Sequence, residues 1–155
     1  MEGTRPILAE IQALVTPTSY PNPQRTATGF DGRRLQMLLA VLEKRGGLRL
    51  SDSDVFVNVT GGLKLSEPAV DLGILGAVAS SLRDRPIPEA CLLVGEVGLG
   101  GEIRRVPQIG LRLGEAAKLG FERAIVPRGA AGRDAPAGLR LDPVDTLADV
   151  MGKLF

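Results

Sequence analysis

Segments with the two-residue hydrophobic period of a β-strand alternate along this chain with segments of helical periodicity, and this alternation limits the possible folds more than any other feature. Residues 7–15 place an apolar side chain at every second position, and residues 54–60 repeat the pattern with three valines. Such alternation is typical of strands with one buried face. Further strands are expected at residues 25–30, 91–97, 102–106 and 123–127.

Capping residues locate the helices between these strands. Asp31 stands where an N-cap is preferred, leucines with helical spacing follow it, and Gly46-Gly47 supplies a stop, so a helix is expected over residues 32–45. Ser66 is expected to cap a second helix that continues to about residue 82. Shorter helices are expected over residues 110–119 and 144–154.

The order of these elements predicts a single layered domain of the α/β or α+β class, because alternating strands and helices must pack their apolar faces on one another. The length of 155 residues fits one ordinary domain. The chain has no histidine and one cysteine, Cys91, which excludes Ser-His-Asp and Cys-His catalysis, an internal disulfide and a cysteine zinc cage. Only 3% of the residues are aromatic, so few side chains are available to stack on nucleic-acid bases.

A glycine cluster at residues 95–101 allows two interpretations. Glycine-rich loops can hold phosphates, but no Gly-Lys-Ser/Thr follows, and the cluster lies between two expected strands rather than before a helix. A hairpin connection explains the glycines better. We therefore expect this chain to bind neither a cofactor nor a metal by itself.

Two further positions allow either a structural or a catalytic role. Lys64 and Ser66 could form a Ser-Lys dyad, although the helix cap explains Ser66 more simply. Asp71 lies within an apolar helix pattern, either as a buried acid with a partner or as a catalytic acid, and the paired acid is the simpler interpretation.

Arginine dominates the cations of this chain. Of the 19 basic residues 15 are arginines, the side chain suited to bidentate phosphate contacts, and doublets occur at Arg33-Arg34 and Arg104-Arg105. Solvated faces or a compositional bias of the source genome would also explain them, and the net charge is only +1. Near-neutrality still permits a local basic stripe, which an assembled ring would multiply around its axis.

Several blocks of residues occur in a recognisable order: Gly3–Pro6 with Glu10–Val15, Leu38–Arg45, Val57–Val59 with Gly61–Lys64, Arg83–Pro86, Gly95–Leu99, Arg104–Gln108 and Glu115–Phe121. Together they resemble the C-terminal domain of the bacterial RadA (Sms) family of DNA repair and recombination ATPases. The resemblance is strong over residues 2–128 and weaker in the tail.

That C-terminal domain is similar to the proteolytic domain of Lon, within the ribosomal-protein-S5 domain 2-like folds. Lon peptidases carry their serine nucleophile in a Pro-Ser-Ala-Gly block, and the similar stretch here has Ala69 at that position. Their lysine follows Pro-Ile-Gly-Gly-Leu, where this chain has Arg112. Alanine has no nucleophile and arginine stays protonated, so the resemblance implies that the dyad is lost and that the domain is not an enzyme.

The resemblance implies a hexameric scaffold that contacts single-stranded or branched DNA during recombination, branch migration and repair. Phosphate contacts by basic side chains carry no base preference, so binding should be independent of sequence and should weaken with salt. The basic residues inside family-like blocks are the expected DNA contacts: Arg5, Arg33, Arg34, Lys64, Arg85, Arg104 and Arg105.

Other expectations concern the parent protein. Residues 1–155 correspond to the Lon-like domain alone, because the zinc finger and the RecA-like ATPase core of the family, with their zinc, ATP and magnesium, find no counterpart in this sequence. A RecA-type recombinase is the expected partner of the parent protein. We expect no membrane contact and a cytoplasmic location. Two alternatives stay open: a residual Ser-Lys peptidase that uses Ser66, and a structural oligomerisation domain without DNA contact.

Overall fold

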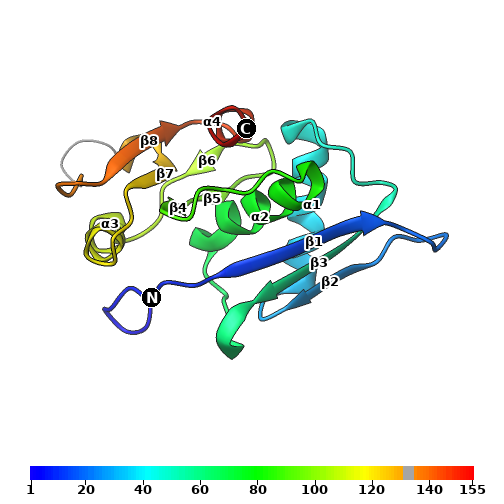
Figure 1. Cartoon of the computed structure of the whole chain (residues 1–155), viewed down its shortest axis with the longest axis horizontal. Helices are drawn as coiled ribbons and strands as arrows, with labels where there is room; N and C mark the ends of the chain where they lie inside the picture. The colour runs from blue at the N-terminus through cyan, green and yellow to red at the C-terminus, as the bar shows by residue number, and fades with distance from the viewer. Residues whose placement is uncertain (131–134) are drawn as a thin grey trace.

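A three-stranded mixed sheet forms one side of the molecule in the computed structural model, which describes residues 1–130 and 135–155 (Figure 1). Its strands are β1 (Ile11–Pro17), β2 (Arg25–Thr28) and β3 (Ser53–Val59), in the order β1-β3-β2. β1 runs antiparallel to β3, with Ala13 opposite Val57, and β2 runs parallel to β3. The valines of β3 are buried, as the alternation predicts.

Two helices cover the inner face of this sheet. In α1 (Gly32–Gly46) the Asp31 side chain accepts a hydrogen bond from the Arg33 amide, and Gly47 ends the helix in the left-handed conformation at φ 71°. The predicted helix is therefore confirmed to within one residue. The second helix, α2 (Asp71–Arg83), follows a short 3₁₀ turn, η2 (Pro68–Val70). It packs on β1 and lies between the first sheet and the second (Figure 1).

The second sheet is parallel and consists of β4 (Cys91–Leu93), β7 (Arg123–Pro127) and β8 (Arg140–Val144), in the order β4-β7-β8. Helices α3 (Ile109–Lys118) and α4 (Leu147–Leu154) pack beside it. A small antiparallel hairpin of β5 (Glu96–Val97) and β6 (Ile103–Arg104) confirms the hairpin interpretation of the glycine cluster. The described residues also include two short 3₁₀ turns, η1 (Thr60–Gly62) and η3 (Arg128–Ala130).

Two hydrophobic clusters hold these layers together. The larger one joins the first sheet, α1, α2 and α4, and includes Leu35, Leu38 and Leu42 of α1, which are inaccessible to solvent. The smaller one lies between β7 and α3 and includes Leu113. At Gly76 a methyl group would lie 2.4 Å from a Leu93 carbon, so glycine lets α2 pack directly against β4. No helix in the described part of the chain is long and apolar enough to cross a bilayer.

Four local predictions were wrong. Ser66 caps no helix, because η2 follows Glu67 and neither η2 nor α2 has a side-chain cap. Residues 7–10 are not a strand, and β1 begins at Ile11. The expected strand over residues 91–97 divides, because Gly95 leaves the sheet to bond Ala69. Residues 140–143 carry no predicted element and a helix is predicted from residue 144, but residues 140–144 form the edge strand β8 and α4 begins only at Leu147.

Candidate functional site

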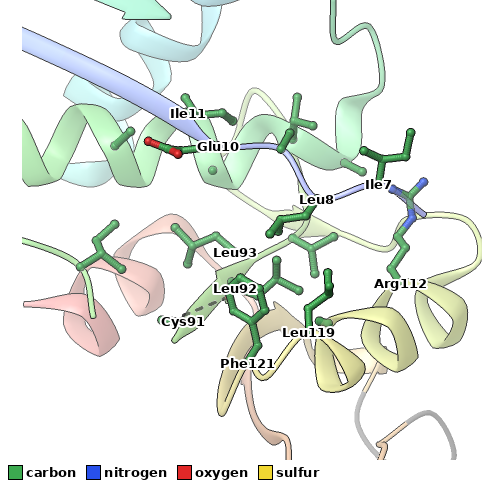
Figure 2. Close-up of a pocket in the computed structure, with 18 of the residues that line it drawn as sticks. Ile7, Leu8, Glu10, Ile11, Cys91, Leu92, Leu93, Arg112, Leu119 and Phe121 are labelled. Carbon is green, nitrogen blue, oxygen red and sulfur yellow. Dashed lines mark hydrogen bonds between the residues drawn. The ribbon is translucent and has the colours of Figure 1, made fainter. Parts of the chain in front are cut away.

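A groove of about 860 Å³ opens between the N-terminal segment, α2, β4 and α3 (Figure 2), and we call it the inter-sheet groove. Ala69 and Arg112, the two positions that the sequence analysis expects in place of a Lon-type dyad, both line it. They are 43 residues apart in sequence (112 − 69), so only the tertiary fold brings them together. Ala69 is buried at the centre of η2, and its carbonyl accepts a hydrogen bond from the Gly95 amide at 3.0 Å.

Arg112 is held in place by acceptors on both sides. Its Nη2 donates to Glu67 Oε2 at 2.6 Å, and its Nε donates to the Pro107 carbonyl at 2.9 Å. The N-terminal ammonium also bonds Glu67. Although burial raises the pKa of Glu67, these two cations outweigh it and lower that pKa below its ordinary value. Arg112 is therefore a fixed, charged partner of a carboxylate, without a lone pair that could accept a proton.

The second possible dyad, Lys64 and Ser66, lies in the exposed segment before η2. Within residues 1–130 and 135–155 no hydrogen bond joins the two side chains or orients the Ser66 hydroxyl. A serine nucleophile needs a base within hydrogen-bond reach, and this pair lacks that contact.

Asp71 at the start of α2 is a paired structural acid, as its simpler interpretation predicted. Its side chain is inaccessible to solvent. Arg34 donates to both carboxylate oxygens, at 2.8 and 2.5 Å, and the Val97 amide donates to Oδ2 at 3.0 Å. The hydrogen bond to Asp71 raises the pKa of Arg34 further, against the opposing effect of burial. This cluster joins α1, α2 and β5.

Four of the seven predicted DNA contacts lie around the N-terminal end of α1. Arg33 and Arg34 occupy its first turn. Lys64 precedes Leu65, whose amide bonds the Gly29 carbonyl at 2.8 Å and so brings the loop beside this end of the helix. Arg104 on β6 lies 3.7 Å from Glu96 Oε1, and the charge of Glu96 also acts on Arg34. We call Arg33, Arg34, Lys64 and Arg104 the α1 patch.

The other three predicted contacts are not grouped with the α1 patch, although Arg105 directly follows Arg104 in sequence. Arg5 is exposed in the N-terminal turn. Arg85 follows α2, where its guanidinium lies 5.8 Å from the centre of the Phe155 ring and donates to the Phe155 carbonyl at 3.1 Å. Arg105 donates to the Gly129 carbonyl at 2.5 Å. The predicted set is therefore spread over several parts of the surface.

Sequence reasoning missed the partners that hold these side chains. Glu67 carried no recognisable signal, yet it fixes Arg112 across 45 positions, and Arg123 pairs with Asp142 between β7 and the unexpected strand β8. Contacts across such separations leave no local periodicity to read. In residues 1–130 and 135–155 no group of three or more acidic, cysteine or histidine side chains is arranged to hold a metal ion.

Comparison with known proteins gives a consistent result. The chain is 53% identical over 154 residues to the DNA repair protein RadA of Pseudomonas aeruginosa, 53% over 150 residues to that of Escherichia coli, and 54% over 154 residues to that of Synechocystis. These alignments cover 97–99% of this chain and 29–34% of the relatives. No model of a protein family matches it.

The chain thus spans about a third of the length of the relatives it matches. The aligned part lies at the C-terminal end of those proteins, and the identity is uniform at about half across relatives from distant bacteria. The resemblance drawn from the sequence blocks is therefore confirmed: this chain matches the C-terminal domain of the RadA family of DNA repair proteins.

Proposed function

We propose that this chain is a non-proteolytic scaffold and sequence-independent DNA-binding domain that acts in DNA repair. The observation that carries the proposal is the match to RadA proteins over nearly the whole chain, because those relatives are named for DNA repair. The parent protein would supply ATP hydrolysis, magnesium and zinc sites and a recombinase partner from segments outside these residues. Its place of action would be the cytoplasm.

The chemistry of two side chains supports the proposed absence of proteolysis. Ala69 ends in a methyl group and cannot attack a peptide carbonyl. Arg112 stays protonated at any working pH and is already bonded to Glu67, so it cannot take a proton from a nucleophile. A Lon-like fold with these residues would keep the shape of a peptidase and lose its reaction.

The α1 patch is the proposed site of DNA contact. Arg33 and Lys64 are exposed, and neither has an ion pair among the described residues, so both can reach phosphate oxygens. Arg104 is 55% exposed and shares its charge with Glu102 and Glu96. Because each phosphate contact displaces condensed counterions, the binding should be insensitive to base sequence and should weaken as salt rises.

Three of the predicted contacts, including Arg34 of the α1 patch, require rearrangement before they bind DNA. Arg34 would have to leave Asp71, and Arg85 and Arg105 would have to leave backbone carbonyls. Arg5 has no such restraint but lies away from the α1 patch. A hexameric ring, as the family resemblance implies, would bring six copies of the patch around one axis and would strengthen a weak single contact.

Charge reversal tests the DNA surface. Fluorescence anisotropy with a random single-stranded oligonucleotide should show that Arg33→Glu and Lys64→Glu each weaken the affinity for DNA about tenfold or more relative to wild type. Arg49→Glu is the matched control, because Arg49 is 78% exposed and its contacts with Ser51 and Asp52 are at the exposed surface. Its DNA binding should stay within about twofold of wild type. Equal affinity of all four proteins would refute the assignment.

Two further measurements separate the alternatives. Sedimentation of a ring that shifts no DNA would favour a structural oligomerisation domain. Cleavage of casein that is abolished by Ser66→Ala would establish a Ser-Lys peptidase. The proposal predicts a ring that binds DNA and leaves casein intact, with Ser66→Ala indistinguishable from wild type.

A further inference from the structure

The inter-sheet groove has the backbone and the side chains of a peptide-binding site. One wall is the N-terminal segment with Ile7 and Leu8, and the opposite wall is β4 with Leu92 and Leu93 (Figure 2). The floor is formed by small residues of η2 and of one face of α2: Ala69, Gly73, Ala77, Ser80 and Ser81. Small side chains on the floor leave room for a chain to approach the strands on both sides.

The edge of β4 that faces away from β7 is unpaired. Arg123 donates to the Ala90 carbonyl at 3.2 Å and Val94 donates to Ile125 at 3.2 Å, so the even-numbered residues of β4 bond β7. Alternation along a strand then turns the backbone N–H and C=O of Leu93 toward the groove. Neither group has a hydrogen-bond partner among the described residues.

The outer edge of β1 is unpaired as well. Thr60 donates to the Glu10 carbonyl at 3.0 Å, so the even-numbered residues of β1 bond β3 and the odd-numbered residues point away from it. Val15 donates outward to Ser81 Oγ at 2.9 Å. The outward groups of Ile11 and Ala13 have no partner within the described ranges, and both residues line the groove.

Two free strand edges, one from each sheet, thus face a single groove. Unpaired edges of this kind are ready templates for another strand, and proteins use them to bind extended peptides. An added strand would present alternate side chains to the apolar rim, where Ile7 and Leu8 are 45% and 46% exposed and Leu119 is 54% exposed. The burial of these exposed apolar groups would favour binding.

The charge of the groove indicates the polar side chains of the occupant. Glu10, Glu89 and Glu115 line it, and none of the three forms an ion pair in the part of the chain that the structure describes. Arg112, the only cation in the lining, is neutralised by Glu67. The groove is therefore acidic and complements lysine or arginine.

We propose that the inter-sheet groove binds an extended segment of a partner protein with alternating apolar and basic side chains, which adds a strand to the free edges of β4 and β1. The backbone edges would supply the affinity, and the carboxylates would select the charge. This role is independent of the DNA contact at the α1 patch, because it uses other residues and no phosphate.

Synthetic peptides test the proposal with the full chain. A fluorescein-labelled decapeptide of alternating valine and lysine should bind about tenfold or more tightly than the valine–glutamate peptide. The same valine–lysine peptide with alternate amides N-methylated keeps its charge and side chains but cannot pair as a strand, so it should lose about tenfold in affinity. Equal binding of the methylated peptide would overturn strand addition.

Variants locate the binding. Ala77→Phe should fill the groove and weaken the valine–lysine peptide about tenfold. Ala40→Phe on the exposed face of α1 is the matched control and should have no effect. Peptide binding should also slow hydrogen exchange at the Leu93 amide. Thermal melting controls for folding, and neither variant should melt at a lower temperature than wild type. The proposal is wrong if Ala77→Phe binds the valine–lysine peptide as tightly as wild type. It is also wrong if Ala77→Phe breaks up an oligomer, because a second copy of the chain would then occupy the groove.

Discussion

The contact between Asp71 and Arg34 should be the most sensitive polar contact in the fold. Asp71 has no solvent exposure and accepts three hydrogen bonds, while the Arg34 side chain is 26% exposed. Asp71→Asn removes the negative charge and turns the side-chain N–H₂ group toward one of the donors that Asp71 now accepts from, in Arg34 or the Val97 amide. Removing one partner of a buried pair costs about 3–5 kcal/mol, and the partial exposure of Arg34 places the expected loss near the lower limit, at about 3 kcal/mol.

Urea unfolding measures this loss directly. With an m-value of about 2 kcal/mol per molar for a domain of this size, the midpoint should fall by about 1.5 M. The double variant Arg34→Met with Asp71→Leu replaces the pair by apolar side chains, so it should recover most of the stability. A midpoint that falls by less than about 0.5 M in the single variant, or a double variant less stable than the single one, would refute the reasoning.

Two further predictions concern pH and backbone conformation. Burial raises the pKa of Asp142, but the hydrogen bond and the charge of Arg123 outweigh this effect and lower that pKa below its ordinary value. The carboxylate therefore stabilises the fold above its ordinary pKa, and this stabilisation is lost as the pH falls through the lowered pKa of the folded state. Urea midpoints of wild type and Asp142→Asn should therefore differ near neutral pH and converge in acid, and a constant difference would contradict this. Gly29 has φ 80°, and a methyl group there would lie 2.5 Å from the Leu63 carbonyl oxygen. Gly29→Ala should therefore lower Tm by about 5 °C or more. The control Gly32→Ala places its methyl group in open space at the start of α1 and should leave Tm unchanged or raise it.

The elements that sequence patterns predicted well are those with local signals at both ends. Asp31 and Gly47 bracket α1, and β7 is a short apolar run between turns, so each was predicted closely. Ser66 failed because Glu67 and Pro68 already begin η2 without a cap. The edge strand β8 contains a proline and few apolar residues, which made its pattern resemble a loop.

The candidate sites were harder to predict because they depend on contacts between distant segments. The buried acid at Asp71 was expected, but Arg34 was not predicted as its partner, since a single sequence does not reveal which arginine meets which carboxylate. The inter-sheet groove depends on the unpaired edges of β1 and β4, and strand pairing cannot be read from periodicity alone. Local sequence thus predicts elements better than it predicts sites.

The salt dependence of DNA binding tests the central claim most directly. If Lys64 contacts a phosphate, the plot of log affinity against log salt for single-stranded DNA should become shallower by about 0.7 in Lys64→Ala, the value expected for one lost contact. Arg49→Ala should keep the wild-type slope. A wild-type affinity that is independent of salt, or a slope that Lys64→Ala leaves unchanged, would contradict the proposed DNA interface.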